Sequence, residues 1–298
     1  MISFPNSNPP PINVSVLQTA GGNSAGGQHS GQHKCVPTGG QHKCVRTEGG
    51  HHKIDTHIHG RYSSDSIIDY RELCKKAIEK KYKVIVFTEH YDLIDTELME
   101  YGLLPLKRYI SELAEIKKEF PELKIITGIE LGEPHIVGDF AKRLFLDFQI
   151  EYIIGSLHVT RSGLNVSLKI DKPLSNKDIK EYYEENLEMV RKGGFDTLGH
   201  LGIFKRGLQH FDIAEEKHCH HIIDEIFREI IKKNIFLEVN YSGFKTKFQN
   251  HIPEPEILKR YKKMGGKLIS IGSDSHDLEF FDKYYQKTFE NMRELGFF

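Results

Sequence analysis

The segment KIDTHIH, residues 53–59, combines β-forming residues with two histidines at its carboxyl end. Six more short β-type runs follow, at residues 83–90, 124–131, 152–158, 197–201, 235–240 and 267–274. Helical patterns separate these runs, and such alternation is typical of a parallel sheet with helices outside it. Seven units favour a closed (β/α)7 barrel of the α/β class, although an open sheet fits the alternation too.

Helical periodicity is clear in three of the intervening segments. Apolar side chains recur there at i, i+3, i+4 and i+7, and the stripes are Tyr70, Leu73, Cys74, Ala77 and Ile78; Ile179, Tyr182, Tyr183 and Asn186; and Ile223, Ile226, Phe227 and Ile230. Two glycine pairs, Gly193-Gly194 and Gly265-Gly266, stand just before a strand, where glycine commonly ends a helix. These stripes predict helices that each bury one face against the sheet.

The first 52 residues differ from the rest in composition. They contain Pro9, Pro10 and Pro11, a glycine-rich stretch and almost no periodic apolar pattern, which predicts a disordered extension. The sequence GQHKCV occurs at 31–36 and again at 40–45, so the histidines and cysteines of this repeat could bind a soft metal. We favour a translated direct repeat or a start codon assigned too far upstream, because the ligand spacing is tighter than in zinc knuckles. Residues 53–298 are expected to hold the whole barrel and its activity.

Composition excludes several functional classes. The 41 basic and 42 acidic residues give a net charge of −1, so no nucleic acid is expected as a partner. No run of about 18 apolar residues is present, and we expect no membrane association and a cytoplasmic location. Four cysteines are too few for a disulfide scaffold. Motifs of the cysteine-dependent and aspartyl-phosphate phosphatases and of phosphate-binding loops are absent from the sequence.

Metal-binding residue types stand at the carboxyl ends of six of the seven predicted strands. They are His57 and His59, Glu89 and His90, Glu130, His158, His200, and Asp274 and His276. A single histidine at a strand end is usually an ordinary polar residue, but a series of this kind is hard to reach by accident. In parallel barrels the carboxyl ends of the strands surround the active site, so these side chains should converge. Converging imidazoles and carboxylates predict a site for borderline divalent cations.

These motifs, in this order, resemble the PHP (polymerase and histidinol phosphatase) superfamily. They read DTHIH (55–59), TEH (88–90), GIE (128–130), SLH (156–158), GHL (199–201) and SDSH (273–276), and the resemblance covers about residues 53–298. It is greatest to the histidinol-phosphatase branch, through the segment between the second and third strands, LEVNYSGF (237–244) and IPEPEIL (252–258). The resemblance implies a distorted TIM-like barrel that holds three divalent metals and hydrolyses L-histidinol phosphate in histidine biosynthesis.

The resemblance also implies which residues hold the metals. One metal would be bound by His57, His59, Glu130 and Asp274; a second would share Glu130 and add His158 and His200; and a third would use Asp65, His90 and His276. Asp65 lies in the loop GRYSSDS, where family members carry Asp or His. We expect Asp55 to orient the first histidine rather than bind metal, and Glu89 has no assigned ligand role.

Chemistry at such a site would start from an activated water. Two metals that share a carboxylate lie roughly 3.5–4 Å apart and can bridge a water whose pKa falls towards neutrality. The resulting hydroxide would attack phosphorus in line, which makes Glu130 and Asp274 candidate catalytic residues. Arg161 and Arg206 are candidate phosphate clamps, or else solvated loop arginines. The leaving-group acid stays open between a metal-bound water and a side chain such as His251.

Several functional questions stay open at this level. Zn, Mn and Fe all accept imidazole and carboxylate ligands, and the sequence does not give the oligomeric state. The expected partner is a small phosphomonoester, whose head group could meet Tyr91-Asp92, Glu133-Pro134-His135 or Tyr241-Ser242. The alternatives are a PHP phosphoesterase for nucleotides, oligonucleotide ends or phosphotyrosine proteins, and a non-catalytic metal-binding accessory module.

Overall fold

The structure is a computed structural model that describes residues 52–92, 105–137, 145, 148–208 and 216–298. The proposed extension, apart from His52, and its His–Cys repeat lie outside these residues. No helix in the described part of the chain is both long enough and apolar enough to cross a membrane.

Seven parallel strands form one sheet in sequence order. They are β1 (Lys53–Ile58), β2 (Tyr82–Tyr91), β3 (Lys124–Gly132), β4 (Tyr152–Ser156), β5 (Thr197–Leu198), β6 (Phe236–Asn240) and β7 (Ile269–Gly272). All seven predicted strands are therefore present. The first and last meet at their carboxyl ends, where the Asp274 amide donates to the carbonyl of His57 at 2.8 Å and the His59 amide to that of Ser275 at 3.0 Å. These bonds close the sheet, which confirms the TIM-like barrel.

The register between strands sets which side chains become neighbours. β2 and β3 pair without interruption from Val84 and Lys124 to Tyr91 and Leu131, and this register places His90 directly beside Glu130. The strands are buried along almost their whole length, as expected for a parallel sheet that is covered by helices on one face and filled by side chains on the other.

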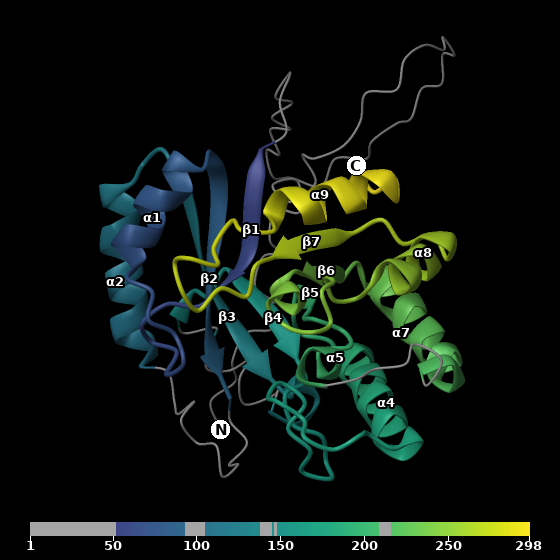
Figure 1. The fold of residues 1–298 in the computed structure, drawn as a ribbon. Helices are drawn as coiled ribbons and strands as arrows, with labels where there is room; N and C mark the ends of the chain where they lie inside the picture. The colour runs from purple at the N-terminus through teal and green to yellow at the C-terminus, as the bar shows by residue number, and fades with distance from the viewer. Residues whose placement is uncertain (1–51, 93–104, 138–144, 146–147, 209–215) are drawn as a thin grey trace, which may run out of the picture.

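Helices cover the outside of the barrel (Figure 1). The longer ones are α1 (Tyr70–Glu79), α2 (Leu106–Glu119), α4 (Asn176–Lys192), α7 (His220–Lys233), α8 (Pro255–Lys263) and α9 (Tyr285–Glu294), and the short ones are α5 (Phe204–Gly207), η3 (Lys217–Cys219) and η4 (Ser242–Lys245). The three predicted apolar stripes lie on α1, α4 and α7, and nearly all their side chains are buried. One core packs beneath α4, α7 and α8, and a second beneath α1, α2 and α9.

Local signals fix where these helices begin and end. α4 begins with a capping box, in which the Ser175 hydroxyl accepts from the Asp178 amide and the Asp178 carboxylate accepts from the Ser175 amide. After α8 the chain turns at Gly265, whose φ of 93° suits glycine and agrees with the predicted helix stop.

Tyr109 on α2 ties this helix to the two strands that carry His90 and Glu130. Its buried hydroxyl lies 2.9 Å from the carbonyl of Phe87 and 2.8 Å from that of Gly128. We expect Tyr109→Phe to lower the free energy of unfolding by about 1 kcal/mol, because a buried donor to two carbonyls is lost. Urea unfolding measures this change. Tyr284→Phe is the control, since its hydroxyl makes no hydrogen bond in the described chain, and equal losses in both variants would contradict the assignment.

Candidate active site

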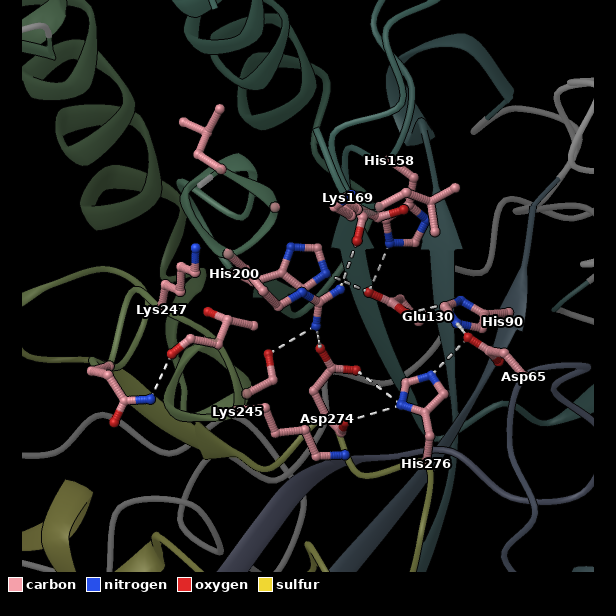
Figure 2. A pocket seen from close by; sticks show the side chains of 18 residues that line it. Asp65, His90, Glu130, His158, Lys169, His200, Lys245, Lys247, Asp274 and His276 are labelled. Carbon is pink, nitrogen blue, oxygen red and sulfur yellow. Dashed lines mark hydrogen bonds and ion pairs between the residues drawn. The ribbon is translucent and has the colours of Figure 1, made fainter. Parts of the chain in front are cut away.

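The carboxyl ends of the strands bring all nine predicted metal ligands together around one cavity. The cavity has a volume of about 910 Å³, and seven of the predicted ligands line it: Asp65, His90, Glu130, His158, His200, Asp274 and His276. The other two, His57 and His59, are fully buried and contact the same carboxylates. Figure 2 shows Glu130 in the middle of this group, with His90, His158 and His200 around it and Asp274 and His276 on one side.

The carboxylate of Glu130 faces two different sets of imidazoles. Its Oε1 lies 2.8 Å from His200 Nε2 and 3.1 Å from His158 Nε2, and the Ser156 hydroxyl donates to it at 2.6 Å. Its Oε2 lies 3.0 Å from His90 Nδ1 and 3.4 Å from Nε2 of both His57 and His59. One carboxylate with ligand groups on both sides is the arrangement that a bridge between two cations needs.

Both central carboxyl groups are held in the charged form. Burial would raise the pKa of the Glu130 carboxyl, but the imidazoles of His57 and His158 outweigh it and hold that pKa well below its usual range. Burial likewise opposes ionisation of Asp274, and His57 and Arg206 reverse the effect, so that its pKa is also far below normal. Two buried negative charges therefore stand among imidazoles at the centre of the site.

The ring nitrogens of His57 and His59 give a direct test of whether cations fit here. His57 Nδ1 lies 2.6 Å from Glu238 Oε1, which places its proton on Nδ1. His59 Nδ1 lies 3.2 Å from the oxygen of Ser63, whose own proton is donated to Glu89. The two Nε2 atoms lie 2.9 Å apart, so a positive charge has to separate their lone pairs. Without a metal, the second proton of His57 supplies it, because burial lowers the pKa of this ring but Glu238 and Glu130 outweigh it and raise that pKa well above its usual range. A divalent cation can take the place of that proton, so the residues fit a metal site.

The described residues offer three groups of metal-ligand atoms, each within 4.8 Å of one another. They are His57, His59 and Glu130; His90, Glu130 and His158; and His59, His90 and His276. Asp65 lies beside the last group, with its Oδ2 3.0 Å from His276 Nε2. The three groups overlap the three predicted ligand sets, but His59 and His90 each belong to two groups, and Asp65, His200 and Asp274 belong to none.

Two carboxylates behind the predicted ligands have a role that the sequence did not reveal. Glu238 on β6 accepts from the His200 amide at 2.6 Å with Oε2, while its Oε1 contacts His57. Asp92 Oδ1 lies 3.0 Å from His158 Nδ1. Such partners fix the orientation and tautomer of a ligating histidine. A signal for Glu238 was present, because it is a charge inside an apolar run on the one strand without a metal-binding residue at its end.

Asp55 and Glu89 fasten backbone and side chains behind the site. Asp55 Oδ1 accepts from the His57 amide at 3.1 Å and the Ser273 amide at 3.0 Å, so it joins β1 to the segment after β7. Glu89 accepts from the Gly60 amide and from the hydroxyls of Ser63 and Tyr70. Both contacts agree with the supporting, non-ligand roles expected of these residues.

Arg206 reaches the cavity from α5. Its Nη1 donates to Asp274 Oδ2 at 2.8 Å and to the Ser242 hydroxyl at 2.9 Å, and its Nη2 donates to the Ser167 carbonyl at 3.0 Å. Asp274 Oδ1 meanwhile faces His59 at 3.3 Å. The guanidinium therefore lies at the border between the ligand cluster and the open cavity.

Arg161 does not line the cavity, so the structure gives no support to its predicted role as a phosphate clamp. Its side chain is 52% exposed and forms an ion pair with Glu188 on α4. The Arg161 amide donates to Glu185 on the same helix, so the loop after β4 runs over α4 and carries the arginine outwards. The alternative interpretation, a solvated loop arginine, describes this side chain.

Most of the segments considered for head-group contacts have structural roles instead. Glu133 is buried and accepts from the amides of His158 and Val159, and His135 pairs with Glu185. Of those segments only Ser242 lines the cavity. His251 is fully buried beside the Pro253 carbonyl and does not line the cavity either, so its position gives no support to a role as the leaving-group acid.

Comparison with known proteins identifies the protein family. The family model of the PHP domain matches residues 55–242, and the chain belongs to this family.

The particular relatives agree on one activity. A Clostridium acetobutylicum protein described as "Probable histidinol-phosphatase" is 30% identical over 229 residues, which cover 74% of this chain and 86% of that protein. The histidinol-phosphatase of Lactococcus lactis is 27% identical over 235 residues, which cover 75% of this chain and 84% of that one. A crystal structure of histidinol phosphate phosphatase from L. lactis, in complex with zinc, L-histidinol and phosphate, is similar with a TM-score of 0.70 and 25% identity, and the match covers 83% of this chain and 94% of that one.

Glu130→Gln tests the bridging carboxylate. The substitution keeps the size of the side chain but removes the charge that two cations would share, so we expect metal content and activity to fall together. Elemental analysis of the purified variant measures the metal. His218→Ala, at an exposed histidine on η3, is the control and should change neither quantity. An inactive Glu130→Gln protein with wild-type metal content would contradict the bridging role.

Glu238→Gln tests the carboxylate behind His57. An amide oxygen accepts a weaker hydrogen bond from His57 Nδ1, so the ring becomes a poorer ligand. We expect metal affinity to fall by about 10–100-fold, as is usual when such a partner is removed. Competition with a chelator of known affinity measures this loss. Unchanged affinity in a folded Glu238→Gln variant would show that Glu238 only packs.

Proposed function

We propose that this protein is a metal-dependent phosphatase that hydrolyses L-histidinol phosphate to L-histidinol and phosphate. The observation that carries the proposal is the Glu130 carboxylate, which lies between two sets of imidazoles at the mouth of the barrel. Similarity to the L. lactis phosphatase crystallised with zinc, L-histidinol and phosphate supports this substrate. The reaction would serve histidine biosynthesis.

The proposed cofactor is a set of three divalent cations, with zinc as the leading candidate because the L. lactis structure contains it. His57, His59, Glu130 and Asp274 would hold one cation; Glu130, His158 and His200 a second; and Asp65, His90 and His276 a third. Manganese and iron accept the same donors. When bound, such cations lower the pKa of a water nucleophile and offset the charge of the phosphoryl oxygens. Glu130 would contribute to two of these cation sites and Asp274 to one.

Arg206 is the proposed phosphate-binding residue of the chain. Its guanidinium is already oriented by Asp274, Ser242 and the Ser167 carbonyl, so little side-chain entropy is lost when phosphate arrives. Its planar group of N–H donors suits the oxygens of a phosphate dianion. The hydrogen bond from Arg206 also orients Asp274, because it holds Oδ2 on the side of the arginine and leaves Oδ1 facing His59.

The rest of the cavity would receive the head group of the substrate. Beyond the ligand cluster it is lined by Ser242, Thr246 and Gln249, which offer hydroxyl and amide groups to an imidazole and an amino alcohol. Lys245 and Lys247 also line it and would attract the incoming dianion. A cytoplasmic location is part of the proposal, in keeping with Cys74 and Cys219, which are both free thiols.

A panel of phosphomonoesters tests the substrate. At one metal loading, we expect kcat/KM for L-histidinol phosphate to exceed that for p-nitrophenyl phosphate and nucleoside monophosphates by at least about a hundredfold, near 2.7 kcal/mol. Hydrogen bonds to a polar head group can give such selectivity, because an analogue without it leaves buried groups unpaired. Release of inorganic phosphate measures each rate. If a nucleotide or a phosphotyrosine peptide is the better substrate, the assignment to histidinol phosphate falls, while phosphatase activity itself stands.

A further inference from the structure

A buried lysine lies next to Arg206 in the chain. Lys205 is 1% exposed, and its Nζ lies 2.7 Å from both oxygens of Glu254 and 2.7 Å from Glu216 Oε1. Both glutamates are also buried, and the hydroxyl of Tyr183 donates to Glu216. None of these residues lines the cavity. We call Lys205, Glu216 and Glu254 the buried charge cluster.

The charges in this cluster balance when one glutamate is neutral. Burial would raise the pKa of Glu254, but the ammonium of Lys205 lowers it below its ordinary value. Burial and the charge of Glu254 raise the pKa of Glu216, which therefore holds a proton. Buried ion pairs add little to stability compared with apolar side chains of the same size. What such a pair can do is fix one arrangement of the elements that it joins.

The elements joined here are a very short helix and two firmer ones. α5 has only four residues, too few to be stable without packing. Glu254 is the N-cap residue of α8, and Glu216 comes directly before η3 and α7. On the other side of α5, Gly207 approaches the Leu168 carbonyl so closely that an added Cβ would lie 2.2 Å from it. α5 is therefore held at Lys205 by the buried charge cluster and at Gly207 by the loop around Leu168. The same loop contacts Arg206 through the Ser167 carbonyl.

We propose that Lys205 is a positioning residue, which anchors α5 to α8 and so sets where the guanidinium of Arg206 stands in the cavity. The inference rests on the proposed function, in that Arg206 is taken to bind the phosphate group. Lys205 itself touches neither the cavity nor the predicted ligands, and it acts through the backbone that it shares with Arg206.

The test uses a variant that removes the buried pair without leaving an unpaired charge. In Lys205→Met/Glu254→Gln both charges disappear while the side chains keep similar volumes, and Glu216 stays neutral. Three quantities are measured on the metal-loaded protein: metal content, kcat/KM for histidinol phosphate and p-nitrophenyl phosphate, and the inhibition constant of inorganic phosphate. Phosphate is the product of every phosphomonoester, so its inhibition constant reports on phosphate binding whichever substrate is preferred.

We expect metal content to stay at the wild-type level while phosphate binds about tenfold more weakly, since small displacements of a positioning group have effects of this order. Arg206→Met alone should weaken phosphate binding by at least as much. The triple variant should then match Arg206→Met within about twofold, because two changes that act through one group do not add. Glu254→Gln alone, which leaves the ammonium in place, should give a smaller loss and serves if the double variant does not fold.

The matched control is another ion pair on α8. Arg260 pairs with Asp224 on α7 at 2.8 Å, away from the cavity, so Arg260→Met/Asp224→Asn should lower the melting temperature and leave phosphate inhibition unchanged. The inference is overturned if the Lys205 variant and this control behave alike, or if the losses from Lys205 and Arg206 multiply. If Arg206→Met does not weaken phosphate binding, the proposed phosphate-binding role of Arg206 is contradicted. This result is distinct from the two outcomes above, which contradict only the role of Lys205.

Discussion

The active site depends on keeping the charge of Glu130 buried. A carboxylate at 1% exposure is costly unless cations or donors surround it, and here five imidazoles from four strand ends and the Ser156 hydroxyl do so. The barrel is what makes this possible, because parallel strands release their carboxyl ends into one space. The direct pairing of His90 with Glu130 across β2 and β3 shows how the sheet register alone places two of these groups side by side.

The predicted ligands around Glu130 are in turn held by a second set of carboxylates. Glu238 and Asp92 hold the outer nitrogens of His57 and His158, and Asp55 and Glu89 hold backbone amides of the segments that carry the ligands. Glu238 and Glu89 have a hydrogen-bond partner at both oxygens, whereas Asp92 Oδ2 has none in the described chain and lies 3.5 Å from His90 Nδ1. These contacts orient the predicted ligands in the absence of any cation, as the hydrogen-bond partners behind a metal site do.

The part of the cavity proposed to bind phosphate is built differently from the proposed metal site. Nearly all the predicted metal ligands stand at strand ends, whereas Arg206 stands on a four-residue helix that is contacted by Glu254 at the start of α8, by the loop at Ser167 and by Ser242. A family relationship and the geometry of the ligands lead to the same class of reaction. The wall of the cavity beyond Arg206, which we propose receives the head group of the substrate, comes from η4 and the loop that follows it.

The sequence by itself determined the seven strands, three of the helices between them and, apart from Asp65, the side chains that gather at the site; Asp65 lies in a loop and was indicated only by the resemblance to the PHP superfamily. The other features follow from local rules, namely apolar periodicity and the position of polar residues at strand ends, which every chain segment carries independently. It did not separate Arg161 from Arg206, because both follow a strand at a short distance and only the packing of the loop over α4 turns one away. It also left Glu238 and Lys205 without a role, and it considered Glu133 for substrate contact rather than for its bond to the His158 amide. Their partners lie far away in the sequence, at His57, His158 and Glu254, and only the closing of the barrel brings them within hydrogen-bonding distance.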